Sequence, residues 1–331
     1  IKVMSGDSAV IVKKVAREVG LWGRGARVVE GKELEGLSEA KLSEVANKET
    51  LFARVTPELK YRLVKSLNRE EHVVAFLGDG VNDAPALKAA DVGIAVDSGA
   101  AVAKEAADIV LLKKDLRVLG EGIEAGRKTF GNVTKYILNT ISANYGNMVT
   151  VAASSLFLRF IPLLPAQILL NNFLSDVPLL AVATDNVDSS FVKRPRHWDI
   201  KMIGEFMVYF GIISSVFDLL LILPLIFWWK SEVAVFRTAW FVESLLSEVV
   251  VTFAIRTRGR FYRSRPSLWL IGLSILASGV AIVLPTTQLG QRWFGLVEVP
   301  FAVKWWIAII VVGYFGVTEV AKGRFFKKWK D

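Results

Sequence analysis

Short apolar runs alternate with longer amphipathic stretches over residues 1 to about 115. The apolar runs are continuous rather than alternating, which is typical of strands that are buried on both faces. Strands that alternate with helices predict a parallel sheet with helices on both of its faces. We expect the strands at Ile1–Met4, Arg27–Glu30, Leu51–Val55, Val73–Leu77, Val92–Val96 and Ile109–Leu112, and helices between them, including Ser8–Val19, Ser38–Asn47 and Pro57–Leu67.

The pattern changes near Lys128, where long apolar segments replace the short runs. Each segment is close to the ~20 residues that a helix needs to cross about 30 Å of hydrocarbon. We therefore expect an α/β domain at 1–127 and an all-α membrane domain of six transmembrane helices at 128–331, joined by a continuous helix through Gly126–Lys135. The six segments are roughly Tyr136–Leu158, Leu163–Thr184, Phe206–Trp229, Ala239–Ile255, Leu268–Leu284 and Trp305–Ala321.

Composition agrees with a membrane protein, because 53% of the 331 residues are hydrophobic, more than most soluble domains carry. The chain has no cysteine, which excludes a disulfide framework and a thiolate metal site, and its two histidines are too few for a histidine cluster. The formal net charge is +9. A basic balance can indicate a nucleic-acid partner, but none is expected here, because Lys and Arg gather beside the apolar segments.

These basic residues are unevenly distributed among the loops. They are frequent before the first apolar segment, after the second, after the fourth and in the tail, and fewer in the loops on the opposite side. Cytoplasmic loops of membrane proteins carry such an excess of Lys and Arg. Both ends of the chain are therefore expected in the cytoplasm, with the lipid membrane as a partner.

The stretch Gly78-Asp79-Gly80-Val81-Asn82-Asp83-Ala84-Pro85-Ala86-Leu87 follows one of the apolar runs directly. Its glycines allow a sharp turn, and Asp79 and Asp83 lie four residues apart across that turn. A Gly-rich turn with two carboxylates at the end of a parallel strand is a common place for Mg²⁺ and phosphate. The spacing alone fits an ordinary acidic turn that caps a helix at Asp83 equally well.

Two further turns follow strands in the same α/β pattern. Ser5-Gly6-Asp7 places a hydroxyl and a glycine before a helix, where N–H groups can hold a phosphate, although by itself this tripeptide more simply caps the helix. Lys60 lies in the first turn of the helix that begins at Pro57. A lone lysine there most simply lies on a solvated helix face.

Polar residues within the apolar segments are costly in a membrane and tend to mark ion pathways. Asn144 and Asn147 share one helix face in the first segment, and Asn172, Ser175 and Asp176 share one in the second. Hydrogen bonds between helices are the simpler role for Asn and Ser. Asp176 is different, because no segment contains a basic residue that could pair with it. Two other acidic residues, Asp218 and Glu243, fit the ion pathway or helix packing equally well. Glu248 and Glu319 lie towards segment ends and fit structural roles.

The ten residues Gly78–Leu87 closely resemble the hinge motif of P-type ATPases, cation pumps with a haloacid-dehalogenase-like phosphorylation domain. The string Ala53–Lys60 and the tripeptide Ser5–Asp7 resemble that family too, although the pumps usually carry Thr where this chain has Ser5. The resemblance implies catalytic roles for Lys60, Asp79, Asn82 and Asp83. It implies that Asp79 and Asp83 bind catalytic Mg²⁺ and that phosphate is held by Ser5, Gly6, Asp7, Lys60, Gly78 and Gly80.

The apolar segments extend the resemblance. Ser142–Asn147 and Asn172–Asp176 look like the ion-site segments of the pumps, and bacterial magnesium-transporting P-type ATPases are the most similar branch. Calcium pumps carry a carboxylate where this chain has Asn147. The resemblance therefore implies transport of Mg²⁺, with Ca²⁺ or H⁺ as alternatives, by an ion site of Asn144, Asn147, Asn172, Ser175 and Asp176 in a prokaryotic plasma membrane.

The pumps transfer the phosphoryl group of ATP to the aspartate of an Asp-Lys-Thr-Gly-Thr string, which this sequence does not contain. It also lacks their nucleotide-binding domain, actuator domain and first four membrane helices. We therefore expect the carboxyl-terminal part of a pump that uses ATP and Mg²⁺, with the missing amino-terminal part as its partner. By itself the chain is expected to be inactive. The alternative is a non-catalytic membrane remnant or a partner subunit of a split pump.

Overall fold

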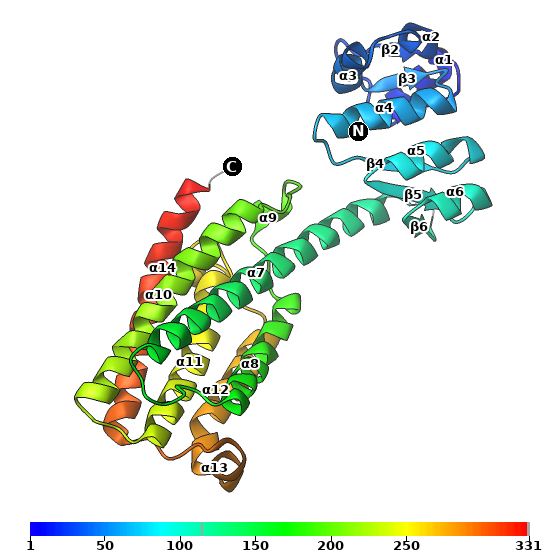
Figure 1. The fold of residues 1–331 in the computed structure, drawn as a ribbon. Coiled ribbons are helices and arrows are strands. Elements are labelled where there is room, and N and C mark those ends of the chain that lie inside the picture. Colours follow the sequence, from blue (N-terminus) through cyan, green and yellow to red (C-terminus); the bar gives the residue numbers. More distant parts are fainter. Residues whose placement is uncertain (114, 330–331) are drawn as a thin grey trace. The chain divides into compact units, whose positions relative to one another are not determined.

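A computed structural model describes residues 1–113 and 115–329 of the chain (Figure 1). The chain divides into two compact units, Ile1–Gly122 and Ile123–Asp331. The first contains all the described strands, and the second is helical. The division falls within one long helix, α7, Leu116–Ser155.

The strands of the first unit form two parallel sheets of three strands each. Their order is β1-β3-β2 in one sheet and β4-β5-β6 in the other. The expectation of one sheet is wrong in this respect, because no described hydrogen bond joins β1 to β4 and each remains an edge strand. The strands are β1 Val3–Met4, β2 Val28–Glu30, β3 Leu51–Ala53, β4 Ala75–Gly78, β5 Val92–Val96 and β6 Ile109–Leu111.

Helices follow each of the first five strands, as the alternating pattern predicts. They are α1 Ala9–Glu18, α2 Gly31–Leu34, α3 Glu39–Lys48, α4 Pro57–Arg69, α5 Ala84–Ala89 and α6 Ala101–Ala106. Helix α4 begins where the Thr56 side chain accepts a hydrogen bond from the Leu59 N–H at 3.3 Å and Pro57 occupies the first turn. Both features favour a helix start.

Helix α4 lies between the two hydrophobic cores of this unit. Leu59 and Leu63 are buried in the core around Phe52 of the first sheet. Val64 of the same helix is buried in the core around Phe76 of the second sheet. Full burial of such side chains contributes about 1.5–3 kcal/mol each. The packing of α4 therefore fixes the first turn of that helix relative to the strand ends of both sheets.

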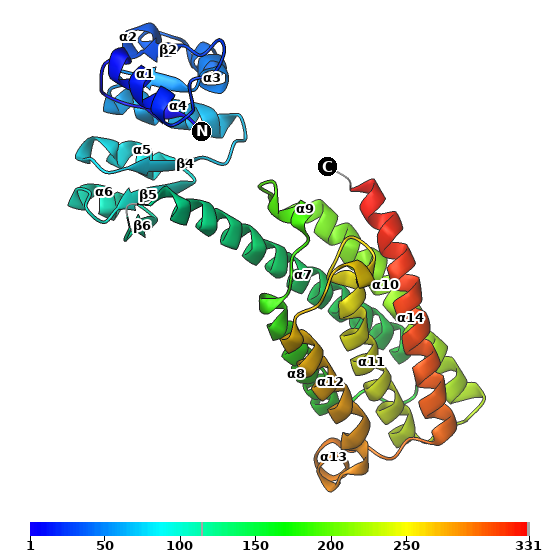
Figure 2. The same cartoon turned by 180° about the vertical axis from the view of Figure 1, so that it is seen from behind.

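The second unit is a bundle of long helices with two short ones between them (Figure 2). Helix α11 packs against α8, α10, α12 and α14 and carries large buried side chains, including Trp240, Phe241 and Leu245. After α7, the helices are α8 Pro165–Leu180, α9 Ser189–Val192, α10 Ile200–Phe227, α11 Val233–Ile255, α12 Leu268–Val283, α13 Gln288–Phe294 and α14 Phe301–Lys328.

Five helical segments in the described part of the chain are long and apolar enough to cross a membrane. They are Pro165–Thr184, Ile200–Phe227, Val233–Ile255, Leu268–Thr286 and Phe301–Lys328. The first expected segment, Tyr136–Leu158, is helical to Ser155 but is not among them. Its asparagines, Asn139, Asn144 and Asn147, make it more polar than the others. Six transmembrane helices are therefore not confirmed.

Candidate functional site

The turn after β4 carries most of the expected phosphate and metal residues. Gly78 ends the strand, a short 3-10 helix follows at Val81–Asp83, and α5 begins at Ala84. A Cβ atom on Gly78 would lie 2.6 Å from the Cβ of Asp83. The turn therefore closes tightly because residue 78 has no side chain.

Lys60 and Asp83 meet across this turn. Lys60 Nζ donates to Asp83 Oδ1 at 2.6 Å, and the Gly80 N–H donates to Asp83 Oδ2 at 3.2 Å. The two side chains are 14% and 10% exposed. Lys60 thus does not lie on a solvated helix face, and both carboxylate oxygens of Asp83 have a donor. The structure brings together three of the expected site residues, Lys60 of α4 and Gly80 and Asp83 of the turn after β4.

Asp79 differs from Asp83, because its side chain is exposed. No hydrogen bond or ion pair to this carboxylate is found in the part of the chain that the structure describes. The Asp79 backbone is held instead, since its carbonyl accepts from the Ala100 N–H at 2.8 Å. A Cβ on Gly99 would lie 3.0 Å from the same carbonyl oxygen. Sequence reasoning missed Gly99 and Ala100, although the glycine shortly after β5 was a signal of close backbone approach.

These side chains fit a magnesium ion that is held mainly by a substrate. Mg²⁺ in phosphoryl-transfer sites takes one or two carboxylates and keeps waters and phosphate oxygens as its other ligands. The described residues contain no group of three or more Asp, Glu, His or Cys side chains that could form a full protein cage. Asp79 is free to bind, whereas Asp83 is paired with Lys60. Asn82 is exposed next to them.

The Ser5–Asp7 turn follows β1 and is closed internally. Ser5 Oγ donates to Asp7 Oδ2 at 3.0 Å, and the Asp7 N–H donates to Ser5 Oγ at 3.1 Å. Within the described ranges, no hydrogen bond or ion pair joins this turn to Lys60 or Asp79. Its role in phosphate binding, together with that of Gly6, stays a prediction.

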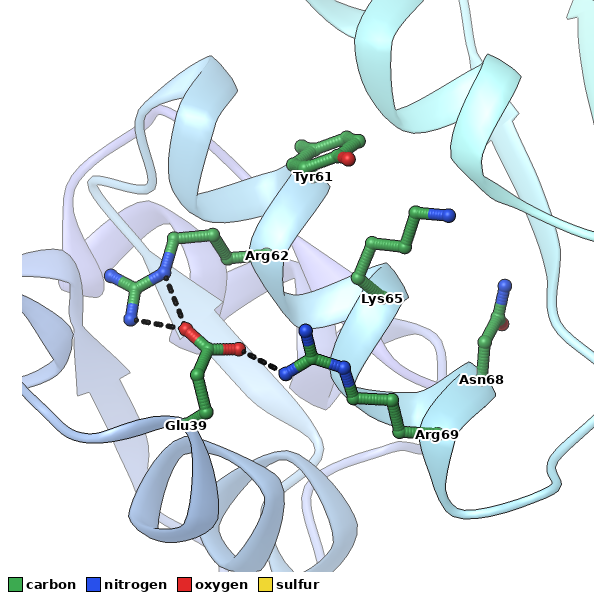
Figure 3. Close-up of a pocket in the computed structure, with 6 residues that line it drawn as sticks. All are labelled: Glu39, Tyr61, Arg62, Lys65, Asn68 and Arg69. Carbon is green, nitrogen blue, oxygen red and sulfur yellow. Dashed lines mark hydrogen bonds and ion pairs between the residues drawn. The ribbon is translucent and has the colours of Figure 1, made fainter.

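The face of α4 that carries Tyr61, Arg62 and Arg69 borders a surface pocket of about 550 Å³ (Figure 3). Glu39 of α3 pairs there with Arg62 at 2.9 Å and with Arg69 at 2.7 Å. The hydrogen bond from Arg62 holds the pKa of Glu39 below its ordinary value. These pairs join α3 to the helix that carries Lys60. The pocket is also lined by Tyr61, Lys65 and Asn68.

We expect Gly78→Ala to loosen this turn, because the added methyl group would overlap the Asp83 side chain. Overpacking of this kind costs about 1–3 kcal/mol. The measurement is amide hydrogen exchange of residues 78–84, which should be faster in the variant. Gly80→Ala is the matched control, since its Cβ would lie 3.5 Å from Asp83 Oδ2, an ordinary contact distance. Equal exchange in both variants would contradict the packing argument.

The expected ion-site residues of the helical unit lie in different surroundings. Asn144 and Asp176 are exposed, Asn147 and Asn172 are half-buried, and Ser175 is buried. No described hydrogen bond joins the α7 residues of this set to those of α8. Ser244 of α11 stands between the two helices instead: its hydroxyl donates to Asn147 Oδ1 at 3.3 Å and accepts from Asn171 Nδ2 at 3.1 Å.

Glu248 of α11 lies one helical turn after Ser244, although the sequence indicated only a structural role for it. Its side chain is buried, and it interacts electrostatically with Ser175 and Asp176 of α8. One of its oxygens, Oε2, has no hydrogen-bond partner among the described residues. A second acidic residue therefore lies within electrostatic reach of Asp176. Its spacing along α11 is no signal by itself, because only the packing of α11 against α8 brings it there.

Two family models match the chain. Residues 1–91 match haloacid dehalogenase-like hydrolases, and residues 160–324 match the C-terminus of cation transporting ATPases. These matches cover most of the sheet unit and most of the helical unit. Two separate family models thus confirm the resemblance that the Gly78–Leu87 motif and the apolar segments indicated.

Curated relatives match the chain nearly end to end. The magnesium-transporting ATPases, P-type 1, of Salmonella typhimurium and Escherichia coli are each 42% identical over 336 residues, which cover 99% of this chain and 37% of the relative. The calcium-transporting ATPase of Bacillus subtilis is 32% identical over 298 residues, which cover 86% of this chain and 34% of that relative. The chain thus spans little more than a third of the length of these relatives. It belongs to the P-type ATPases and matches their carboxyl-terminal part.

Proposed function

We propose that the chain is the ion-transporting and phosphoryl-handling part of an ATP-driven magnesium pump of a prokaryotic plasma membrane. The observation that carries this proposal is the 42% identity to magnesium-transporting ATPases over 99% of the chain. The identity covers both the turn at Asp79 and the helices around Asp176. The pump would use ATP and Mg²⁺, and the phosphorylated aspartate would be supplied by sequence outside this chain.

In the sheet unit, the proposed roles follow the contacts. Asp79 is the carboxylate free to hold Mg²⁺, which when bound neutralises charge on the transferred phosphoryl group. Lys60 would also neutralise charge on the phosphoryl group, and Asp83 holds its ammonium group in place. Asn82, Gly78 and Gly80 shape the turn. Ser5, Gly6 and Asp7 are proposed to line the phosphate.

In the helical unit, we propose six membrane crossings, with the polar end of α7 as the first. A helix that carries several asparagines can cross a membrane where neighbouring helices cover its polar face. The loops rich in Lys and Arg would then lie on the cytoplasmic side together with both ends of the chain.

The proposed ion site consists of Asp176, Glu248 and Ser175, with the amides of Asn144, Asn147 and Asn172 nearby. Two carboxylates with amide and hydroxyl oxygens match the ligands that a partly hydrated Mg²⁺ takes. Calcium is the second candidate ion, because a calcium-transporting ATPase is among the relatives. That relative is less similar, at 32% identity.

We expect Asp176→Asn in the intact pump to abolish growth rescue of a magnesium-starved, transport-deficient strain. The variant keeps the size of the side chain but removes a charge that the cation needs. The control is Glu298→Gln, which removes a carboxylate that is 72% exposed and is not part of the proposed site. Rescue by Asp176→Asn equal to that of the wild type would remove the assignment of the site.

Transport measurements in the same transport-deficient strain also show which cation the pump carries. Wild-type protein that restores calcium efflux without magnesium uptake would keep the carboxylate site but overturn magnesium as its cargo. Protein that is made and inserted but supports no cation movement would favour a remnant or a partner subunit without transport of its own.

A further inference from the structure

A second acidic pair lies in the core of the helical unit. Asp218 of α10 is 2% exposed, and Glu243 of α11 is 0% exposed. Trp240, three residues before Glu243 on α11, contacts the Asp218 carboxylate with its indole N–H, so both acidic side chains lie at the same contact between α10 and α11. The proposed transport site does not use either residue.

Asp218 is surrounded by hydrogen-bond donors. Thr150 of α7 donates its hydroxyl to Asp218 Oδ2 at 2.6 Å, and Trp240 of α11 donates its indole N–H to Asp218 Oδ1 at 3.2 Å. An indole N–H can donate but never accept or bind a metal. These donors stabilise an ionised carboxylate at residue 218.

The close approach of α7 and α10 places Thr150 there. A Cβ on Gly146 would lie 2.8 Å from Ser214 Cβ, and one on Gly211 would lie 2.5 Å from the Tyr145 ring. Small residues allow two helices to approach this closely. The donor arrangement around Asp218 is therefore built by the packing of three helices.

Glu243 has the opposite surroundings. Neither of its carboxylate oxygens has a hydrogen-bond donor in the described part of the chain. A buried carboxylate without donors or a cation is strongly unfavourable. The titratable groups that act on the pair from the surrounding helices are Glu248 of α11 and Tyr314 of α14, and neither brings a positive charge at neutral pH. Two neighbouring carboxyl groups in such a site hold one proton between them.

We propose that Asp218 and Glu243 form a proton-binding site, in which Glu243 carries a proton and donates it in a hydrogen bond to ionised Asp218. One shared proton supplies the missing donor of Glu243 and removes one of the two buried negative charges. A metal ion fits less well, because the groups that face Asp218, the Thr150 hydroxyl and the Trp240 indole N–H, donate hydrogen bonds to it and the indole cannot be a ligand. The site is distinct from the Asp176 group and does not depend on which cation the pump carries.

The proposed proton site connects α7, α10 and α11, because Thr150, Asp218 and Trp240 come from these three helices. Thr150 lies one helical turn after Asn147 on α7. The helix that contributes amides to the proposed ion site therefore also donates a hydrogen bond, through Thr150, to ionised Asp218. Loss of the proton would leave two facing carboxylates in a dry core.

The test is infrared spectroscopy of the purified full-length protein in detergent, in H₂O and D₂O at neutral pH. A protonated carboxyl group has a carbonyl stretching band that is separate from carboxylate bands and shifts in D₂O. We expect this band in the wild type and its loss in Glu243→Gln, whose amide can still donate to Asp218. Glu298→Gln, at an exposed position, should leave the band unchanged.

Trp240→Phe provides a second reading if Glu243→Gln does not fold. It removes one donor from Asp218, so the hydrogen bond from Glu243 should strengthen and the band should change in frequency without being lost. A band that persists in Glu243→Gln, or an unchanged frequency in Trp240→Phe, would overturn the proposal. Loss of the wild-type band on addition of Mg²⁺, Ca²⁺, Na⁺ or K⁺ would also overturn it, because a metal ion would then displace the proton.

Discussion

Asp79→Asn in the intact pump is expected to reduce phosphoenzyme formation from ATP by about two orders of magnitude or more, the scale on which a single electrostatic group acts in other active sites. Asp79 is exposed and has no protein partner for its carboxylate among the described residues. An amide at this position keeps the shape of the turn but cannot neutralise Mg²⁺. The fold should be retained, because the Ala100 N–H still meets the backbone carbonyl of residue 79.

The measurement is acid-stable, hydroxylamine-sensitive incorporation of phosphate from labelled ATP at saturating Mg²⁺. Glu35→Gln is the matched control, since it exchanges an exposed carboxylate for an amide in the same unit. The 331-residue chain itself supplies the background, because it contains no Asp-Lys-Thr-Gly-Thr string and is expected to incorporate nothing. Incorporation by Asp79→Asn near the wild-type level would exclude Asp79 as the magnesium ligand.

The second large effect is expected at Asp185, just after the helical segment that ends at Thr184. Its side chain is fully buried and pairs with Arg256 at 2.9 Å and with Lys135 at 2.7 Å. Arg256 is 1% exposed and also donates to the backbone carbonyls of Ser264 and Arg265. The Ser267 N–H donates to Asp185 Oδ1 as well. One carboxylate therefore joins α7, the end of the α8 segment, α11 and the loop before α12.

Burial by itself would raise the pKa of Asp185, but the hydrogen bonds and charges of Arg256 and Lys135 outweigh it and lower the pKa. A carboxyl group whose pKa is lower in the folded state contributes stability above its unfolded-state pKa of about 3.9. That contribution is lost as the pH falls through the folded-state pKa. The cluster is therefore fully formed at neutral pH.

We expect Asp185→Ala to destabilise the helical unit by about 3–5 kcal/mol, because Arg256 would remain buried without its anion. For a unit of this size, the midpoint of thermal unfolding in detergent should fall by roughly 10 °C. Glu298→Ala is the control: its ion pair with Lys304 is exposed and should contribute less than about 1 kcal/mol. Equal midpoints for the two variants would contradict a stabilising role of the cluster.

Much of the secondary structure could be predicted from local pattern. Every strand begins and ends within two residues of its expected range, and β5 matches it fully. Helix α4 begins at Pro57, as the Thr-Pro sequence predicts. These features depend on neighbours in the chain, such as apolar runs and capping groups, and local sequence therefore carries them.

The candidate site was predictable in its membership but less so in its contacts. The Gly78–Leu87 motif indicated Asp79 and Asp83, and the string Ala53–Lys60 indicated Lys60, yet neither indicated that Lys60 would lie on Asp83. Glu248 lies towards the end of an apolar segment, which indicated a structural role, and its position along the chain says nothing about Asp176. Side-chain partners far apart in sequence depend on how α4, α8 and α11 pack, which a local pattern does not contain.

The sequence by itself determined the family, the alternation of strands and helices, the positions of five apolar helices and the turn that carries Asp79. Runs of side chains and short motifs encode these features locally. The tertiary structure alone decided that the strands form two sheets, that Arg256 meets Asp185 across 71 positions of the chain, and that Thr150 and Trp240 meet Asp218. Each of these depends on burial, which brings distant charges and edges together and makes an unpaired charge costly.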